Sequence, residues 1–208
     1  MPFPRLYPIL DASCFADAEA MFAAADELVA AGITLLQYRN KSAHASEVLA
    51  HASELKRRVP AHVRLIMNDR ADLCLAAGFD GLHVGQDDLS PAAARRIIGT
   101  GSPDNPRILG VSTHNPEQLA EANTTSADYL AIGPVFATTS KANPDPVVGL
   151  DGVRRARALT SKPLVAIGGI TRANARLVLE AGADCVAVIS DLLLDPRKSA
   201  EEFLRILG

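Results

Sequence analysis

The sequence predicts an α/β protein, a closed (β/α)8 barrel formed by one domain over residues 1–208. Three observations favour this fold. Short apolar runs rich in Val, Ile and Leu recur along the chain, and an amphipathic stretch with helical spacing follows each of them. The junctions "AAGIT", "AAGFD" and "EAGAD" each end a helix at a glycine and begin a strand. No linker rich in Pro, Gly or Ser divides the chain, which favours a single domain.

The predicted strands are nearly continuous in apolar residues, as expected for parallel strands that are covered on both faces. There are eight of them, at residues 5–11, 33–39, 63–68, 80–85, 107–112, 128–133, 163–168 and 184–190. Right-handed crossovers between eight such units close into a barrel. The alternative is a doubly wound open sheet, but no G-x-G-x-x-G follows the first strand.

Helix-start residues mark several segments between these strands. Ser90 precedes Pro91 and Asn115 precedes Pro116, and each pair places a capping side chain directly before a proline at the first helical position. A further helix is expected over residues 171–182, from a threonine to a glycine. The segments between strands are therefore predicted to be helical.

Composition excludes several classes of protein. The net charge is −3 and basic residues are mixed with acidic ones, so no basic stripe is available for nucleic acid. Aromatic residues make up only 4% and Trp is absent, which disfavours a base-stacking surface. No apolar run approaches the roughly 20 residues that span a bilayer, and the N-terminus does not resemble a signal peptide. Cys14, Cys74 and Cys185 are widely spaced, so we expect reduced thiols in a cytoplasmic protein.

The polar residues after the predicted strands indicate anion and metal chemistry. In a parallel barrel the carboxyl ends of the strands meet at the face where active sites are built. Arg39 and Lys41 after the second strand, and Lys141 after the sixth, suit an anion with several oxygens. Asp69 and Asp88 follow the third and fourth strands, and paired carboxylates without His or Cys ligands suit Mg²⁺. Taken singly, the first could be a helix N-cap and the second a solvated loop residue.

A second anion site is expected after strands seven and eight. Gly168 and Gly169 let backbone amides approach a ligand, and a short helix after Ser190 would direct its N-terminus to the same place. Thr138 and Ser140 could add hydroxyl donors. The alternative for the double glycine is an ordinary tight turn. Together the two sites suggest two phosphorylated substrates and one joining reaction.

The histidines and cysteines give no nucleophilic centre. His83 lies inside an apolar run, so we predict a hydrogen-bonded core residue. His114 could act as a general acid or base, or could simply precede a helix cap. No Ser-His-Asp or Cys-His arrangement is recognisable, which disfavours covalent catalysis.

Seven motifs spread over the chain resemble those of the thiamine phosphate synthase family. They are "LQYRNK", "NDRAD", "GLHVGQDD", "GVSTH", "GPVFATTSK", "VAIGGI" and "VAVIS", in this order. The resemblance implies a TIM barrel that condenses a hydroxymethylpyrimidine diphosphate with a thiazole phosphate. The reaction would depend on Mg²⁺ and would begin with loss of diphosphate. Tyr38, Ala137 and Ser140 differ from the residues most often seen in that family, but none of these changes removes a charge or a metal ligand.

The resemblance also implies a role for individual residues. The pyrimidine diphosphate would be held by Gln37, Arg39, Lys41, Asn68, Ser112 and Lys141, of which Arg39, Lys41 and Lys141 would be catalytic. The thiazole phosphate would be held by Thr138, Thr139, Ser140, Gly169, Ile189 and Ser190. The Mg²⁺ ligands would be Asp69 and Asp88.

Two other functions stay open at this point. A thiazole tautomerase of the same fold would use His114 for proton transfer, and a non-catalytic sensor would bind one phosphorylated thiamine precursor without turnover. The partners expected in every case are small phosphorylated heterocycles, with no nucleic acid and no membrane. The sequence leaves open whether the chain forms a homo-oligomer, whether the loop after strand six closes as a lid, and what residues 99–106 do.

Overall fold

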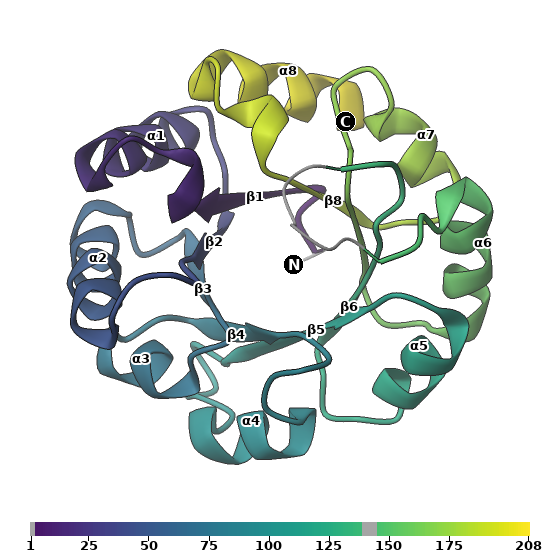
Figure 1. Ribbon diagram of the computed structural model, residues 1–208, viewed down its shortest axis with the longest axis horizontal. Coiled ribbons are helices and arrows are strands. Elements are labelled where there is room, and N and C mark those ends of the chain that lie inside the picture. The colour runs from purple at the N-terminus through teal and green to yellow at the C-terminus, as the bar shows by residue number, and fades with distance from the viewer. Residues whose placement is uncertain (1–2, 139–144) are drawn as a thin grey trace.

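The computed structural model describes residues 3–138 and 145–208, which form a closed barrel of parallel strands inside a ring of helices (Figure 1). Within these residues eight strands pair in chain order, and β1 pairs with β8 to close the sheet. The predicted (β/α)8 barrel is therefore confirmed. Among the described helices none has the length and apolar character needed to cross a membrane.

The strands agree with the predicted runs to within two residues at each end. They are β1 Leu6–Asp11, β2 Leu35–Arg39, β3 Arg64–Asn68, β4 Gly81–Val84, β5 Ile108–Thr113, β6 Tyr129–Ile132, β7 Leu164–Ile167 and β8 Cys185–Val188.

The helices fill the segments between the strands. They are α1 Ala18–Ala30, α2 Ala45–Arg58, α3 Ala71–Ala76, α4 Pro91–Ile98, α5 Pro116–Asn123, α6 Gly149–Leu159, α7 Ala175–Glu180 and α8 Pro196–Leu207, with 3-10 turns η1 Ala12–Cys14 and η2 Ser190–Leu192. The predicted caps are confirmed, because Ser90 accepts the Ala93 N–H and Asn115 accepts the Gln118 N–H.

The predicted helix over 171–182 is shorter than expected. It begins at Ala175 and ends at Glu180. The Thr171 N–H donates to the side chain of Asn174 at 2.8 Å, and the Asn174 N–H donates back to the Thr171 carbonyl at 3.1 Å. This local pair of bonds holds residues 172–174 in a turn, so the helix starts one turn later.

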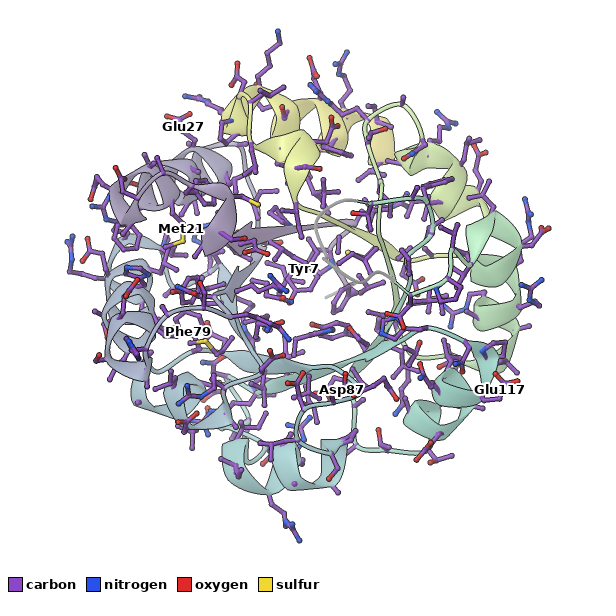
Figure 2. All side chains as sticks on the ribbon, viewed as in Figure 1. Tyr7, Met21, Glu27, Phe79, Asp87 and Glu117 are labelled. Carbon is purple, nitrogen blue, oxygen red and sulfur yellow. The ribbon has the colours of Figure 1, made fainter. Side chains whose placement is uncertain are left out.

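The alternation of each strand separates two apolar cores. Outward-facing residues pack under the helices, and Figure 2 shows Met21 and Phe79 in this layer. Inward-facing residues fill the barrel, and Figure 2 shows Tyr7 inside the ring of strands. Gly110 lies so close to the ring of Tyr129 that a Cβ there would collide with it. The barrel interior is therefore a packed core, which leaves its carboxyl-terminal end for a site.

At the amino-terminal end of the barrel the same set of aspartate contacts occurs three times. Asp80, Asp128 and Asp184 precede β4, β6 and β8, and each accepts a backbone N–H near the start of the preceding strand at 2.7 to 2.9 Å. Each also pairs, at 2.5 to 3.1 Å, with a cation from an outer helix, namely Lys56, Arg95 and Arg157 respectively. Residues 99–106 belong to this end, because Asn105 donates to Asp80 at 3.2 Å.

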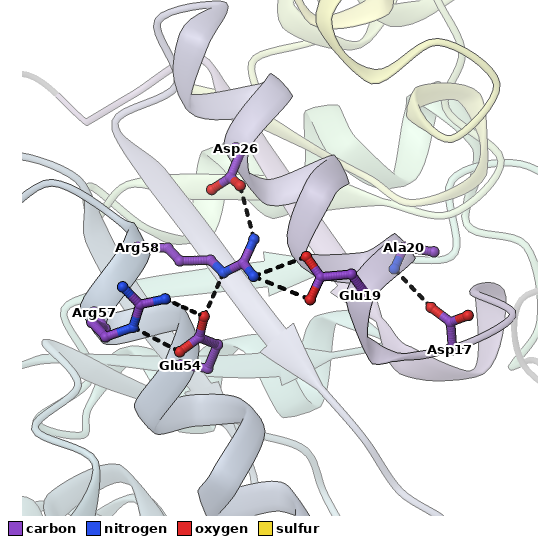
Figure 3. Close-up of polar contacts among 7 residues, drawn as sticks. All are labelled: Asp17, Glu19, Ala20, Asp26, Glu54, Arg57 and Arg58. Carbon is purple, nitrogen blue, oxygen red and sulfur yellow. Dashed lines mark hydrogen bonds and ion pairs between the residues drawn. The ribbon is translucent and has the colours of Figure 1, made fainter.

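Ion pairs on the outside join neighbouring helices. Figure 3 shows Arg58 of α2 between Glu54 of its own helix and Glu19 and Asp26 of α1, at 2.6 to 3.1 Å. The Arg58 guanidinium also lies 5.0 Å from the centre of the Phe22 ring. These contacts lie on the outer surface and do not reach the barrel interior.

Candidate active site

A cavity of about 410 Å³ lies at the carboxyl ends of the strands, a size typical of small-molecule sites. Every predicted site residue within the described ranges lines it, namely Gln37, Arg39, Lys41, Asn68, Asp69, Asp88, Ser112, Thr138, Gly169, Ile189 and Ser190. The predicted residues Thr139, Ser140 and Lys141 lie outside the described residues. Positions up to 153 residues apart in the sequence (37 to 190) thus meet at one cavity.

Arg39 is held at the cavity wall by a carboxylate that the sequence analysis missed. Its guanidinium pairs with Asp11, which ends β1 and is only 2% exposed. Asp11 also accepts the Ser13 N–H at 3.1 Å and the Ser13 hydroxyl at 2.7 Å. The clue was available, because Asp11 is the polar residue at the end of the first strand. A guanidinium has five N–H donors, so this pairing leaves others for a ligand.

Lys41, Asp69 and Asp88 form a second charged group at the cavity. The Lys41 ammonium lies 2.9 Å from the Asp69 carboxylate. Burial, together with a hydrogen bond to Asp88, raises the pKa of Asp69 to about 6. Burial acts to raise the pKa of Asp88 as well, but the hydrogen bonds from Asp69 and from the Gly85 N–H outweigh it and lower that pKa. Below about pH 6 the two carboxylates therefore hold one proton between them, because they lie too close for both to ionise easily.

The backbone places these carboxylates in the cavity. Asp69 has a φ of 61°, in the left-handed region, and its N–H donates to the His83 carbonyl at 2.8 Å. The alternative role of Asp69 as a helix N-cap is wrong, because Arg70 occupies that position of α3 and no side chain caps it. Asp88 is tied back by the Gly85 N–H at 2.9 Å.

The carboxylate pair fits a hard divalent cation. In the described part of the chain no three His, Cys, Asp or Glu side chains gather as a metal site. Mg²⁺ commonly takes one or two carboxylates from a protein, and water and substrate phosphate supply the rest. Asp69 and Asp88 are a donor set of this kind, whereas zinc would need more protein ligands.

The backbone of the double glycine, at the opposite wall of the cavity, can be adopted only by residues without a Cβ. Gly168 and Gly169 have φ values of 100° and 62°, and a Cβ on either would collide with residues 134–137 after β6. The Phe136 N–H donates to the Gly168 carbonyl at 3.0 Å. Ser190 begins η2, so the short helix expected after this residue is present as a 3-10 turn. The tight turn is confirmed, and its backbone lines the cavity, so an anion site at these glycines stays a prediction.

The two histidines differ in how they meet the cavity. His114 has its Nδ1 2.7 Å from the Gly133 carbonyl and its Nε2 3.5 Å from Asp145. His83 is buried and hydrogen-bonded through both nitrogens, as predicted, and burial lowers its pKa to about 4. His83 lines the cavity together with one of its partners, Ser112, so it belongs to the cavity wall and also holds Ser112 in place.

The chain is similar to known proteins over nearly its whole length. Residues 6–192 match the family model described as thiamine monophosphate synthase. A thiamine-phosphate synthase of Koribacter versatilis is 61% identical over 100% of this chain and 97% of its own. A thiamine-phosphate synthase of Chloroflexus aurantiacus is 44% identical, and the match covers 98% of this chain and 92% of that protein. A solved thiamine phosphate pyrophosphorylase from Pyrococcus furiosus has 33% identity and a TM-score of 0.83, covering 98% of this chain and 95% of its own.

Proposed function

The chain belongs to the thiamine monophosphate synthase family and is a transferase, and we propose the reaction and residue roles of its cavity as follows. The cavity condenses 4-amino-2-methyl-5-(diphosphooxymethyl)pyrimidine with 4-methyl-5-(2-phosphooxyethyl)thiazole. The products are thiamine phosphate and diphosphate. One observation carries the proposal: a single cavity contains two cations, a pair of carboxylates and a glycine turn on its opposite wall.

The diphosphate of the pyrimidine would lie at the Arg39 and Lys41 wall. Arg39 is fixed by Asp11, so its remaining N–H groups are oriented before a ligand arrives. Asp69 and Asp88 would hold Mg²⁺, which supplies positive charge to the leaving diphosphate. Lys41 pairs with Asp69 at 2.9 Å and would then turn to the phosphate oxygens. Lys141, outside the described residues, is proposed as the third cation of this group.

The residues suit a reaction in which the bond to diphosphate breaks first. The C–O electron pair leaves with diphosphate, and the aminopyrimidine stabilises the resulting carbocation. The ring nitrogen of the thiazole then donates its lone pair to form the C–N bond. No enzyme nucleophile takes part, so the residues serve to hold both substrates in line and to neutralise the departing charge.

The phosphate of the thiazole would lie against the double-glycine turn. Gly169 exposes backbone there, and Ile189 and Ser190 line the same wall. Thr138 also lines the cavity and has a hydroxyl for the phosphate. Thr139 and Ser140 are proposed for the same role and lie outside the described residues.

We also propose that the protein works in the cytoplasm. Cys14, Cys74 and Cys185 are the chain's three cysteines, and all three are free thiols. Free thiols without disulfides are typical of a reducing compartment.

The test is to incubate the purified chain with both phosphorylated heterocycles, with Mg²⁺ or with a chelator. Thiamine phosphate would be measured by mass spectrometry and diphosphate by a coupled assay. We expect equal amounts of both products with Mg²⁺ and little of either with chelator. The Asp184→Asn variant, altered at the far end of the barrel, is the matched control and should form both products.

Two outcomes would contradict the proposal. A folded protein that makes no thiamine phosphate would exclude the joining reaction and favour proton transfer at His114 or a sensor. Equal product formation with and without Mg²⁺ would leave the reaction in place but exclude the metal role of Asp69 and Asp88.

A further inference from the structure

A chain of hydrogen bonds crosses the barrel interior at the inner wall of the cavity. Gln37 Nε2 donates to the Tyr7 hydroxyl at 2.9 Å. The Tyr7 and Tyr129 hydroxyls lie 3.0 Å apart, and the Tyr129 hydroxyl lies 2.8 Å from His83 Nδ1. His83 Nε2 lies 2.8 Å from the Ser112 hydroxyl. Of these residues all but Tyr129 line the cavity. We call these five residues the buried polar chain.

The surroundings of the buried polar chain hold its groups in place. Tyr7 and Tyr129 are at most 1% exposed and their rings meet edge to face at 5.9 Å. The His83 ring stacks on Tyr129 at 5.5 Å. Because the two tyrosine hydroxyls and the His83 ring, which is 8% exposed, are largely shielded from water, they must find their hydrogen-bond partners within the buried polar chain.

The donors and acceptors of the buried polar chain fix a single direction in which its hydrogen bonds are donated. Tyr7 accepts from the Gln37 amide, so its own proton goes to Tyr129. The Tyr129 proton then goes to His83 Nδ1. A neutral imidazole has one N–H, which must therefore be at Nε2 and donate to Ser112. Each hydrogen bond of the buried polar chain then has one donor and one acceptor.

The direction of donation determines what the cavity offers to a ligand. Gln37 gives one of its two amide N–H groups to Tyr7, which fixes the orientation of the amide and leaves Oε1, which has no hydrogen-bond partner in the described residues, as an acceptor. Ser112 accepts from His83, so its hydroxyl proton is left as a donor. Reversing this pattern would require the amide to flip, the imidazole to change tautomer and every hydroxyl to turn together.

We propose that Tyr7, Tyr129 and His83 are positioning residues that fix this acceptor and donor and so make the cavity select a 4-aminopyrimidine over a 4-oxopyrimidine. The inference rests on the proposed function, because that function supplies the pyrimidine. An aminopyrimidine offers an exocyclic N–H donor beside a ring-nitrogen acceptor. Its 4-oxo counterpart inverts both, with a carbonyl acceptor beside a ring N–H donor. A site with a fixed pattern of polar groups rejects an inverted ligand because buried groups are left unpaired.

The specificity test compares dissociation constants for the two pyrimidines as their monophosphates, which lack the diphosphate leaving group. The variants are Tyr129→Phe and Tyr7→Phe, which keep the ring and remove one link. We expect the preference for the amino over the oxo ligand to fall by roughly tenfold or more in each variant. Tyr38→Phe is the matched control. Tyr38 is also fully buried and bonded to a histidine, His51, but faces away from the cavity, so the preference should not change.

A second measurement needs no ligand. In ¹⁵N-histidine-labelled protein the chemical shifts distinguish a protonated ring nitrogen from an unprotonated one, and a His83→Gln variant identifies the His83 signals. We expect His83 to be protonated at Nε2. In Tyr129→Phe, which removes the proton donor to Nδ1, we expect the other tautomer to appear.

The inference would be overturned by protonation of His83 at Nδ1 in the unaltered protein, or by an unchanged ligand preference in a folded Tyr7→Phe or Tyr129→Phe variant. A merely structural role would lower the melting temperature and weaken both ligands equally. If the protein makes no thiamine phosphate yet shows the Nε2 tautomer and the amino preference, the proposed reaction fails and the role of the buried polar chain stands.

Discussion

Aspartates lie at both ends of the barrel, and their surroundings differ. At the amino-terminal end, Asp80, Asp128 and Asp184 each meet a backbone N–H and a cation from an outer helix. At the carboxyl-terminal end, Asp69 and Asp88 face each other, and Lys41 pairs with one of them.

The difference separates stability from function. A carboxylate with an N–H donor and a cation is fully compensated and stabilises the fold. Asp69 and Asp88 face each other and Lys41 pairs with only one of them, so their charge is only partly compensated, and a left-handed backbone at Asp69 adds to the cost. Charge that is only partly compensated and backbone strain are typical of positions where a ligand completes the site. The predictions below follow from this contrast, from the largest effect to the smallest.

The largest effect is expected at the carboxyl-terminal end. Asp69→Asn and Asp88→Asn should each lower turnover by roughly 100-fold or more, because each removes a proposed metal ligand. The melting temperature of the metal-free protein should stay equal or rise, because the repulsion between the carboxylates is lost. Product formation over a Mg²⁺ titration and thermal melting measure the two effects. Wild-type turnover and metal dependence in either variant would refute the assignment.

Asp→Asn substitutions at the amino-terminal end should lower stability and leave turnover unchanged. Asp80→Asn should lower the free energy of unfolding by about 2 kcal/mol, because Asp80 is 5% exposed and its bonds to Lys56 and to a strand N–H weaken. Asp184→Asn should have a smaller effect, since its side chain is 46% exposed. Urea unfolding measures both. Turnover of the folded variants should be unchanged, and a loss of turnover without a loss of stability would contradict the contrast.

The raised pKa of Asp69 predicts a pH dependence at the carboxyl-terminal end. The folded protein keeps this proton up to about pH 6, whereas an ordinary Asp loses it near 3.8. The folded state therefore binds more protons in this window, and the stability of the metal-free protein should fall as the pH rises through it. The lowered pKa of Asp88 acts below this window.

Metal binding should respond in the opposite direction over the same pH range. Mg²⁺ must displace the shared proton, so its apparent affinity should weaken by up to about tenfold per pH unit below about pH 6. Calorimetric titrations across this range, with Asp69→Asn for comparison, measure it. An affinity independent of pH would show that the carboxylates do not share a proton.

The smallest effect is expected on the outer surface. Arg58 makes more ion pairs than any residue discussed above (Figure 3), yet these pairs are solvated. Arg58→Ala should lower the melting temperature less than Asp80→Asn does, and less still at high salt. Turnover should not change. A loss larger than that of Asp80→Asn would show that the surface network stabilises the fold more than the buried carboxylate does.

The features that follow local rules were predictable from the sequence. Apolar runs gave the strands, and the parallel arrangement placed Arg39, Asp69 and Asp88 at one end because the polar residues follow the strands. Contacts that depend on closure of the barrel were not predictable. Tyr7 and Tyr129 are 122 residues apart and meet only because β1 and β6 face each other inside the barrel. The left-handed backbone of Asp69 is likewise fixed by a bond to the neighbouring strand.

The most direct test of the contrast between the two ends is a crystal of the protein grown with Mn²⁺, in place of Mg²⁺, and diphosphate. Anomalous scattering locates the metal without reference to any other assumption. We predict a peak within bonding distance of carboxylate oxygens of both Asp69 and Asp88. A peak at Asp80, Asp128 or Asp184, or no peak at the carboxyl-terminal end with diphosphate bound, would contradict the account.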